Sequence, residues 1–328
     1  MGKMINTVAG KISVDDMGKT LMHEHLVFGY DGYEADCAGA LSREEVVDRT
    51  IKIAKKIMSY GVKTVLDATA MDCGRDVELL REVSEKTGLN IICSTGYYNQ
   101  STGSSRYWWN LSLTGDEVKH REELLMTELT KGAAGTNILP GVIKVATSEG
   151  VITDYEQKWL EVAGRVQKAT GAVIYTHTQT GTMGEEQVHI LIENGANPEK
   201  IVVGHMCGNQ DTGYHDRILA KGVSVGFDRL GQDYLGYPTD EERLKIMKHD
   251  VEAGYLNRIV ISHDVLGTMW GAPWNLSEAT EDVQKAFRNF YQWYIMDKFI
   301  PRMIEKEGYT EEQVNQMFIE NPKRIFGA

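Results

Sequence analysis

One pattern recurs along the chain: a short run rich in Val, Ile and Leu, a polar turn, and then a segment whose apolar residues are spaced as in a helix. The runs are nearly continuous in apolar residues, which is typical of strands buried on both faces of a parallel sheet. Eight such runs lie at Thr20–His25, Val62–Ala68, Asn90–Thr95, Gly141–Ala146, Ala172–Thr178, Ile201–His205, Val223–Phe227 and Arg258–Ser262.

Helix starts are marked between these runs. A Ser or Thr followed three residues later by Glu or Gln is a capping box, and the chain has this pair at Ser42–Glu45, Thr153–Glu156, Thr239–Glu242 and Thr310–Gln313. Eight strands that alternate with helices predict the α/β class and a closed (β/α)8 TIM barrel, a single domain spanning residues 1–328. A doubly wound open sheet is the alternative, but no G-x-G-x-x-G or P-loop sequence follows any strand.

Three segments are additional to the eight strand–helix units of a basic barrel. Residues 1–19 are expected to form a short N-terminal β-hairpin. Residues 97–120 and 265–284 are expected to be long loops after the third and eighth strands. Loops at the C-terminal ends of barrel strands carry the active site in this fold, so the functional residues are expected there.

Side chains that bind metals stand at the C-terminal ends of several strands: His23 and His25, His177, His205 and Asp264. Strand alternation places His23 and His25 on one face and Glu24 on the other. A single histidine in a strand is more often a hydrogen-bonded core residue, and an H-x-H pair alone is weak. Four His and one Asp at one end of a barrel are too many for a single catalytic zinc ion, and they favour two metal ions.

Lys144 lies inside the apolar fourth strand. A lysine in such a strand is costly unless it is paired or modified. Burial also frees the amine as a nucleophile, and reaction with carbon dioxide would turn it into a carbamate, an anion able to bridge two metals. One half of a buried ion pair is the alternative.

At these positions the sequence resembles the phosphotriesterase family of the amidohydrolase superfamily. The matching pieces cover almost the whole chain in order: residues 20–25, 143–150, 176–178, 204–205, 261–264 and 320–323. The resemblance implies that one metal is held by His23, His25 and Asp264 and the other by His177 and His205. N-carboxylated Lys144 and a hydroxide would bridge them. Relatives use zinc, and manganese, cobalt or iron can substitute.

Within this family the chain looks most like the phosphotriesterase-like lactonases, because Thr95-Gly96-Tyr97-Tyr98 and the segment 226–231 resemble theirs. The resemblance gives catalytic roles to three residues. Asp264 accepts a proton, Tyr98 orients the ester, and Arg229 holds Tyr98 or the leaving side. The expected reaction is the opening of acyl-homoserine or γ/δ-lactones, with weak activity on organophosphate triesters.

Other reactions on the same centre stay open, namely hydrolysis of phosphotriesters, carboxylic esters or phosphorylated sugar lactones. A non-catalytic metal-binding scaffold is disfavoured by the complete ligand set. Aromatic residues are candidates for the wall of an apolar substrate pocket, although each has ordinary packing as its alternative: Phe28, Trp108, Trp109 and Trp270.

One position departs from the family pattern. Relatives often carry an aspartate of a proton relay three residues after the histidine of the sixth strand, where this chain has Gly208. Asn209 or Asp211 is a candidate replacement, and the absence of a relay is the alternative.

The balance of charges limits the partners. The net charge is −12, from 35 basic and 47 acidic residues, which argues against nucleic acid or an anionic membrane as the partner. Four cysteines are too sparse for a disulfide framework, and the N-terminal residues lack the apolar core of a signal peptide. A cytoplasmic enzyme for a small ester or lactone is expected, and the resemblance implies a homodimer.

Overall fold

The computed structural model describes residues 2–102, 106–113, 115–233, 236–273 and 276–328. A parallel sheet curls through the molecule in the order β10-β9-β8-β7-β6-β5-β4-β3-β11. Its strands are β3 (Lys19–Phe28), β4 (Val62–Asp67), β5 (Asn90–Gly96), β6 (Val142–Thr147), β7 (Val173–Thr178), β8 (Ile201–Gly204), β9 (Ser224–Phe227), β10 (Ile259–Ile261) and β11 (Leu266–Met269).

The two edge strands of this order belong to one stretch of chain that is interrupted at residues 262–265. β10 pairs with β9, and β11 pairs with β3. Between them, the Asp264 amide donates to the His23 carbonyl at 3.0 Å and the His25 amide donates to the Val265 carbonyl at 3.4 Å. The interrupted eighth strand therefore meets the first strand, and the predicted (β/α)8 TIM barrel is confirmed.

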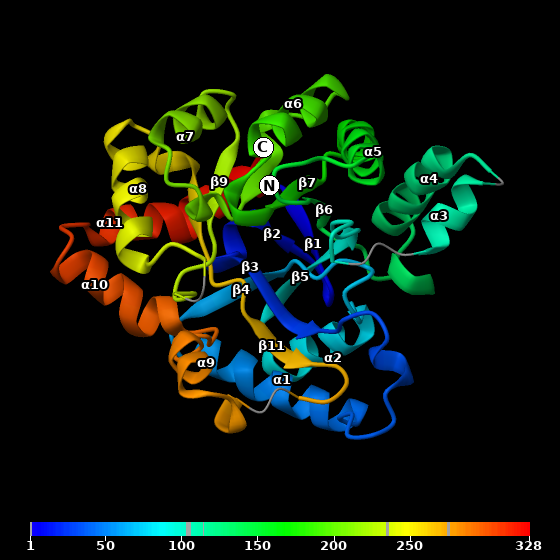
Figure 1. Cartoon of the computed structure of the whole chain (residues 1–328), viewed down its shortest axis with the longest axis horizontal. Coiled ribbons are helices and arrows are strands. Elements are labelled where there is room, and N and C mark those ends of the chain that lie inside the picture. Colours follow the sequence, from blue (N-terminus) through cyan, green and yellow to red (C-terminus); the bar gives the residue numbers. More distant parts are fainter. Residues whose placement is uncertain (1, 103–105, 114, 234–235, 274–275) are drawn as a thin grey trace.

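Helices lie around the outside of the strands (Figure 1). They are α1 (Arg43–Met58), α2 (Val77–Thr87), α3 (Arg106–Ser112), α4 (Glu117–Thr130), α5 (Asp154–Thr170), α6 (Gly184–Glu193), α7 (Thr212–Leu219), α8 (Asp240–Glu252), α9 (Glu281–Ala286), α10 (Ile300–Glu305), α11 (Glu311–Asn315) and α12 (Asn321–Gly327). All four predicted capping boxes form, at the starts of α1, α5, α8 and α11. Their reciprocal bonds satisfy amides that have no partner inside the helix.

The core has two parts. One large cluster fills the space between the strands and the surrounding helices. A second, smaller cluster contains side chains from several strands, such as Leu66, Val142 and Val202, together with Ile5 of the N-terminal hairpin and Phe326 of α12. The hairpin, β1 (Met4–Thr7) and β2 (Gly10–Ser13), is antiparallel as predicted. The second cluster fills the end of the barrel that the hairpin and α12 contact with apolar side chains. The polar side chains therefore lie at the other end, where the strands have their C-terminal ends.

The two predicted long loops contain regular structure. Residues 97–120 include α3 and the start of α4, and α3 forms because Trp108 is buried against neighbouring aromatic rings. Residues 265–284 include β11 and α9, and β11 forms because β3 offers it a free edge. Residues 103–105, 114 and 274–275 of these segments lie outside the described residues. In the described part of the chain, no helix is both long and apolar enough to cross a membrane.

Candidate active site

The predicted ligands of the first metal converge at the seam of the barrel. His23 and His25 extend from β3, and their Nε2 atoms lie 3.3 Å and 3.0 Å from Oδ1 of Asp264. The Nζ atom of Lys144, from β6, lies 3.1 Å from Nε2 of His23. Glu24 points away as predicted, and it accepts hydrogen bonds from Ser262 and His263.

The predicted ligands of the second metal meet on the opposite side of Asp264. His177 comes from β7, and His205 directly follows β8. Nδ1 of His177 and Nε2 of His205 are 2.8 Å apart, and Nε2 of His205 is 3.7 Å from Oδ2 of Asp264. The structure thus brings all six predicted ligands together, with Asp264 between the two halves.

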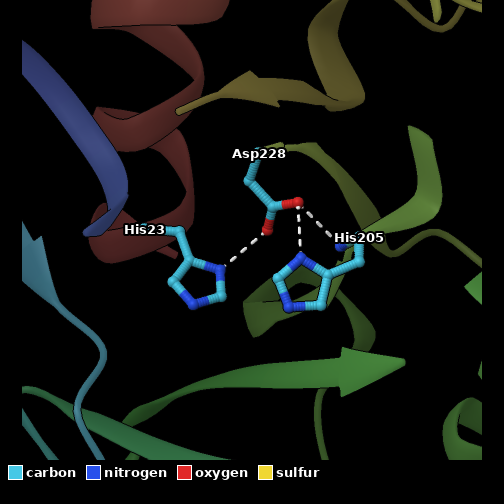
Figure 2. A group of neighbouring side chains, drawn as sticks. All are labelled: His23, His205 and Asp228. Carbon is cyan, nitrogen blue, oxygen red and sulfur yellow. Dashed lines mark hydrogen bonds and ion pairs between the residues drawn. The ribbon is translucent and has the colours of Figure 1, made fainter. Parts of the chain in front are cut away.

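Asp228 supports both halves from behind. Its Oδ2 lies 2.8 Å from Nδ1 of His23, and its Oδ1 lies 3.0 Å from Nδ1 of His205 and accepts the His205 amide at 2.8 Å (Figure 2). Tyr175 also donates to Oδ2 at 2.7 Å. His23, His205 and Asp228 are close enough to suggest a metal site of their own. However, Asp228 holds the outer nitrogen of each ring, so it orients the two ligands instead of completing a separate site.

Asp228 is the residue that sequence reasoning missed. It directly follows the seventh strand, β9, which is the same kind of position that identified His177 and His205. An acid at a strand's C-terminal end was therefore the available signal.

The outer nitrogens of the other two histidines are also held. Nδ1 of His25 lies 2.9 Å from the hydroxyl of Thr69, which itself donates to the Val27 carbonyl at 3.1 Å. Nε2 of His177 lies 2.9 Å from Oε1 of Gln179. Each outer nitrogen therefore faces an acceptor and must carry the hydrogen of the neutral ring. These tautomers are assigned from the bonding partners.

It follows that all four rings present a lone pair toward the centre. Two such lone pairs, on His177 and His205, face each other at 2.8 Å, and two others face the carboxylate of Asp264. The Lys144 ammonium can offset this repulsion only beside His23, and the contacts of the other three rings repel unless a further cation lies among them. Two ligands bound tetrahedrally at ~2.1 Å from one zinc ion are ~3.4 Å apart, close to the separations seen here. The donor set therefore fits divalent metal ions.

Burial keeps His23, His177 and His205 in the neutral state that metal ligation needs. Burial and the neighbouring Lys144 ammonium lower the pKa of His23 to about 3. Burial, with the nearby His205, holds the pKa of His177 well below its usual value. Burial also lowers the pKa of Lys144 to about 8, so its amine loses its proton far more readily than that of an exposed lysine.

The carboxylate of Asp264 is ionised. Burial alone would raise its pKa, but its neighbours, among them the cationic Arg229, hold the pKa well below its usual value. Nε of Arg229 donates to Oδ2 of Asp264 at 3.0 Å. Arg229 therefore binds the carboxylate of Asp264, the residue that is expected to accept the proton.

Tyr98 lies at the other half of the centre. Its hydroxyl is 3.2 Å from Nδ1 of His177, and burial keeps its pKa well above the usual value. Because that nitrogen carries a lone pair, the tyrosine hydroxyl is the donor in this bond. Tyr98 therefore offers a proton donor beside the ligands.

Two of the predicted ligands have strained backbones. His205 has a φ of 60° and Asp264 a φ of 53°, the left-handed region that residues other than glycine rarely adopt. Such strain costs about 1–3 kcal/mol per residue and clusters at functional sites. Here it turns the chain sharply where β8 and β10 end and directs both side chains inward.

The four aromatic candidates lie at different distances from the ligands. The Phe28 ring packs edge-on against His25 at 5.2 Å, and it lines a small hollow with Tyr30, Asp72, Cys73, Tyr98 and Thr102. Trp270 donates to the Gly74 carbonyl and stacks on Tyr33. Trp108 is buried against Tyr97 and Trp159, whereas Trp109 is exposed. Among these four candidates, only Phe28 has a ring contact with a predicted ligand in the described part of the chain.

The candidate replacements for the relay acid are engaged elsewhere. The Asn209 amide donates to the Gly181 carbonyl at 3.1 Å, and Asp211 caps α7 at the surface. At Gly208 itself, a Cβ atom would lie 3.0 Å from the Thr180 carbonyl carbon. The turn therefore packs too closely against its neighbour to admit an aspartate unchanged, and neither candidate replacement points at the centre.

Comparisons with known proteins agree with this geometry. A sequence model of the phosphotriesterase family matches residues 3–326. The aryldialkylphosphatase of Saccharolobus solfataricus is 32% identical over 97% of this chain and 98% of its own length.

Among solved structures, the organophosphorus hydrolase of Deinococcus radiodurans is 40% identical with a TM-score of 0.95, covering 99% of this chain and 97% of that one. A structure from the engineering of organophosphate hydrolysis on a weak promiscuous lactonase template is also 40% identical, with a TM-score of 0.95 and coverage of 99% and 100%. The chain therefore belongs to the phosphotriesterase family and is a hydrolase.

Proposed function

We propose that this hydrolase opens lactones with a centre of two divalent metal ions, and that it cleaves organophosphate triesters as a secondary activity. His23, His25 and Asp264 would hold one ion, His177 and His205 the other, and N-carboxylated Lys144 would lie between them. The observation that carries the proposal is the set of four inward lone pairs, fixed by Asp228, Thr69 and Gln179. Zinc is the expected metal, with manganese, cobalt or iron as substitutes.

Two ions bound there would lower the pKa of a water and polarise the carbonyl or phosphoryl oxygen of the substrate. The residues of the chain handle the protons. Asp264 is ionised and takes a proton from the attacking water, then returns it to the leaving alkoxide. Arg229 fixes the carboxylate through Oδ2 during this exchange.

Tyr98 would orient the substrate. Its hydroxyl now donates to the lone pair of His177, so metal binding at that lone pair would release the hydroxyl to donate to an ester oxygen instead. Because burial keeps the hydroxyl protonated, Tyr98 acts as a hydrogen-bond donor and not as a base.

The relatives favour different substrates. The lactonase template supports lactones as the main substrates, as do the tyrosine at position 98 and the arginine at position 229. The aryldialkylphosphatase and the organophosphorus hydrolase support phosphotriesters as the second candidate. The homodimer expected from the resemblance is part of the same proposal.

A kinetic panel separates these functions. Purified protein loaded with zinc, manganese or cobalt is assayed on γ- and δ-lactones, acyl-homoserine lactones, phosphotriesters and phosphorylated sugar lactones. We expect kcat/KM for the best lactone to exceed that for the best triester at least about tenfold, roughly 1.4 kcal/mol of differential transition-state binding. Asp264→Asn with bound metal should lose nearly all activity.

Each other outcome assigns a different function. A higher kcat/KM on triesters or on phosphorylated lactones would replace the lactonase proposal. Full activity in metal-free protein, or no metal bound at all, would remove the metal centre from it. Bound metal without turnover of any ester would indicate a scaffold.

A further inference from the structure

A buried pair formed by a histidine and an aspartate lies behind the turn that follows His205. His215 of α7 and Asp250 of α8 are both fully buried, and Nδ1 of His215 lies 2.8 Å from Oδ2 of Asp250. On its other side, Nε2 of His215 lies 3.0 Å from the Met206 carbonyl and 3.2 Å from the Asn209 carbonyl.

The turn that His215 contacts is the one that aims His205. It is a 3-10 turn over Met206–Gly208, closed by bonds from the Gly208 amide to the His205 carbonyl at 2.9 Å and from the Asn209 amide to the Met206 carbonyl at 3.0 Å. The turn begins at the left-handed backbone of His205. Such a conformation persists only when its surroundings hold it. The hydrogen bonds from His215 to the Met206 and Asn209 carbonyls are part of what holds it.

Both ring nitrogens of His215 face acceptors: a carboxylate on one side and two carbonyls on the other. Carbonyl oxygens can only accept, so Nε2 carries a hydrogen and donates to the turn, while Asp250 holds the ring through Nδ1. A buried donor that spans two carbonyls therefore clamps the turn.

We propose that His215 and Asp250 are a positioning pair for the His177–His205 half of the metal centre. This inference rests on the proposed function, since it takes His205 as a ligand. His215 clamps the Met206–Gly208 turn, the turn holds the backbone of His205, and that backbone directs Nε2 of His205 toward Nδ1 of His177. His23 and His25 lie within β3, which pairs with β4 and β11, so their backbone is held without this clamp.

Two substitutions at position 215 separate the clamp from ordinary packing. In His215→Asn, the shorter amide can reach toward Asp250 but not to the carbonyls of Met206 and Asn209. In His215→Gln, the longer amide nitrogen lies about where Nε2 was and can restore the donor. We expect His215→Asn to bind one of its two zinc ions about 10-fold more weakly, as outer-shell changes do, while the second ion keeps wild-type affinity. His215→Gln should recover most of the loss.

A matched control is available between the same two helices. Nε2 of His249 in α8 lies 3.1 Å from Oδ1 of Asp216 in α7, at the surface. His249→Asn removes a His–Asp contact between α7 and α8 without touching the turn, so both zinc affinities should stay unchanged. Zinc release to a chromogenic chelator, with metal content per chain counted at each step, measures the two ions separately.

The outcomes are distinct. Unchanged affinities in His215→Asn, or an equal loss at both ions, would overturn the inference while leaving the proposed function intact. A wild-type protein that holds no zinc would overturn both. If His215→Asn does not fold, Asp250→Asn tests the same point, because it keeps a partner for Nδ1 but removes the charge. It should weaken the same single ion by a smaller factor, and a loss at both ions would again contradict the clamp.

Discussion

At the scale of single residues, the chemistry of this centre is set by atoms that face away from it. Each histidine has one nitrogen held by an acceptor, and that bond decides that the other nitrogen offers a lone pair. Asp228 does this for His23 and His205 at once. One carboxylate therefore couples ligands assigned to different metals.

Asp228→Asn should expose this coupling. An amide has one oxygen and one nitrogen, so it can accept from only one of the two Nδ1 atoms, and the other ring loses its fixed tautomer. We expect zinc affinity to fall about 10- to 100-fold, measured by competition with a chelator. Asp211→Asn, at a surface helix cap, is the control and should bind zinc normally. Wild-type affinity in Asp228→Asn would show that Asp228 does not orient the ligands.

The lowered pKa of Lys144 predicts when the carbamate forms. The pKa in the metal-free protein is about 8, below that of a free lysine, so the reactive neutral amine is about 3% of the total at pH 6.5 and about three quarters at pH 8.5. At constant dissolved ¹³CO₂, carbamate formation at Lys144 should therefore begin roughly 25 times faster at the higher pH.

A ¹³C NMR signal from the carbamate measures this rate. Lys200 is a second lysine whose pKa is lowered, to about 7, by burial and by Lys3. The signal assigned to the centre should vanish in Lys144→Met and persist in Lys200→Met. A signal that survives in Lys144→Met belongs to another lysine and would contradict the assignment.

The sequence was sufficient to predict which candidate ligands lie together, because they stand on the barrel strands or shortly after them, and the C-terminal ends of parallel strands converge. Asp228 directly follows β9 and could have been identified by the same rule. The hydrogen bond from Arg229 to Asp264 could not be predicted, because it depends on side-chain directions in a loop. The packing of Trp108 was also beyond the sequence, since its partners Tyr97 and Trp159 lie in other elements.

At the scale of elements, the turns after β7 and β8 are packed backbone to backbone. A Cβ atom at Gly208 would lie 3.0 Å from the Thr180 carbonyl carbon and 3.2 Å from the Gly181 amide nitrogen. Neither is the end of a flexible side chain, so one turn must shift. This close approach favours glycine at position 208.

Gly208→Ala should therefore destabilise the protein by about 1–3 kcal/mol, as overpacking does, and Gly208→Asp by at least as much. Unfolding in urea measures the free energy. Gly115→Ala is the control, because its nearest neighbours would be atoms of Leu111 at 3.7 and 3.8 Å. If Gly208→Asp instead raised both the free energy of unfolding and kcat, the turn would have room for a side chain and the prediction would be wrong.

Helix starts were predictable from local pairs such as Thr153 and Glu156, because a capping box needs only residues three apart. The interruption of the eighth strand was not predictable. β11 is a strand only because β3 lies beside it in the fold, although β3 is 238 or more residues earlier in the chain. The spacing of residues within a short segment cannot indicate such a distant partner.

At the scale of the whole molecule, the centre draws on strands from around the entire barrel. Without metal, lone pairs of His177 and His205 face each other, and those of His23 and His25 face Asp264. Metal removal should therefore lower stability as well as activity. An ion at 1,000 times its Kd contributes about 4 kcal/mol to the folded state.

Calorimetry with and without a chelator tests this linkage. The Tm should fall on chelation, return on adding zinc, and rise further with zinc concentration. His177→Asn, which removes one proposed ligand of the second ion, should show a smaller difference between the two conditions. Equal Tm values for the wild type with and without chelator would mean that the centre binds no metal tightly.

The interrupted eighth strand also sets an order of events during synthesis. Residues 262–265 carry Asp264 and lie at the seam where the ring closes on β3. A ribosome that has delivered the first seven strands has already exposed His23, His25, Lys144, His177 and His205, but it has not yet made the residue that lies between the two halves. The nascent chain therefore cannot assemble the reactive centre until its barrel can close, and the last ligand to be synthesised is also part of the closing seam.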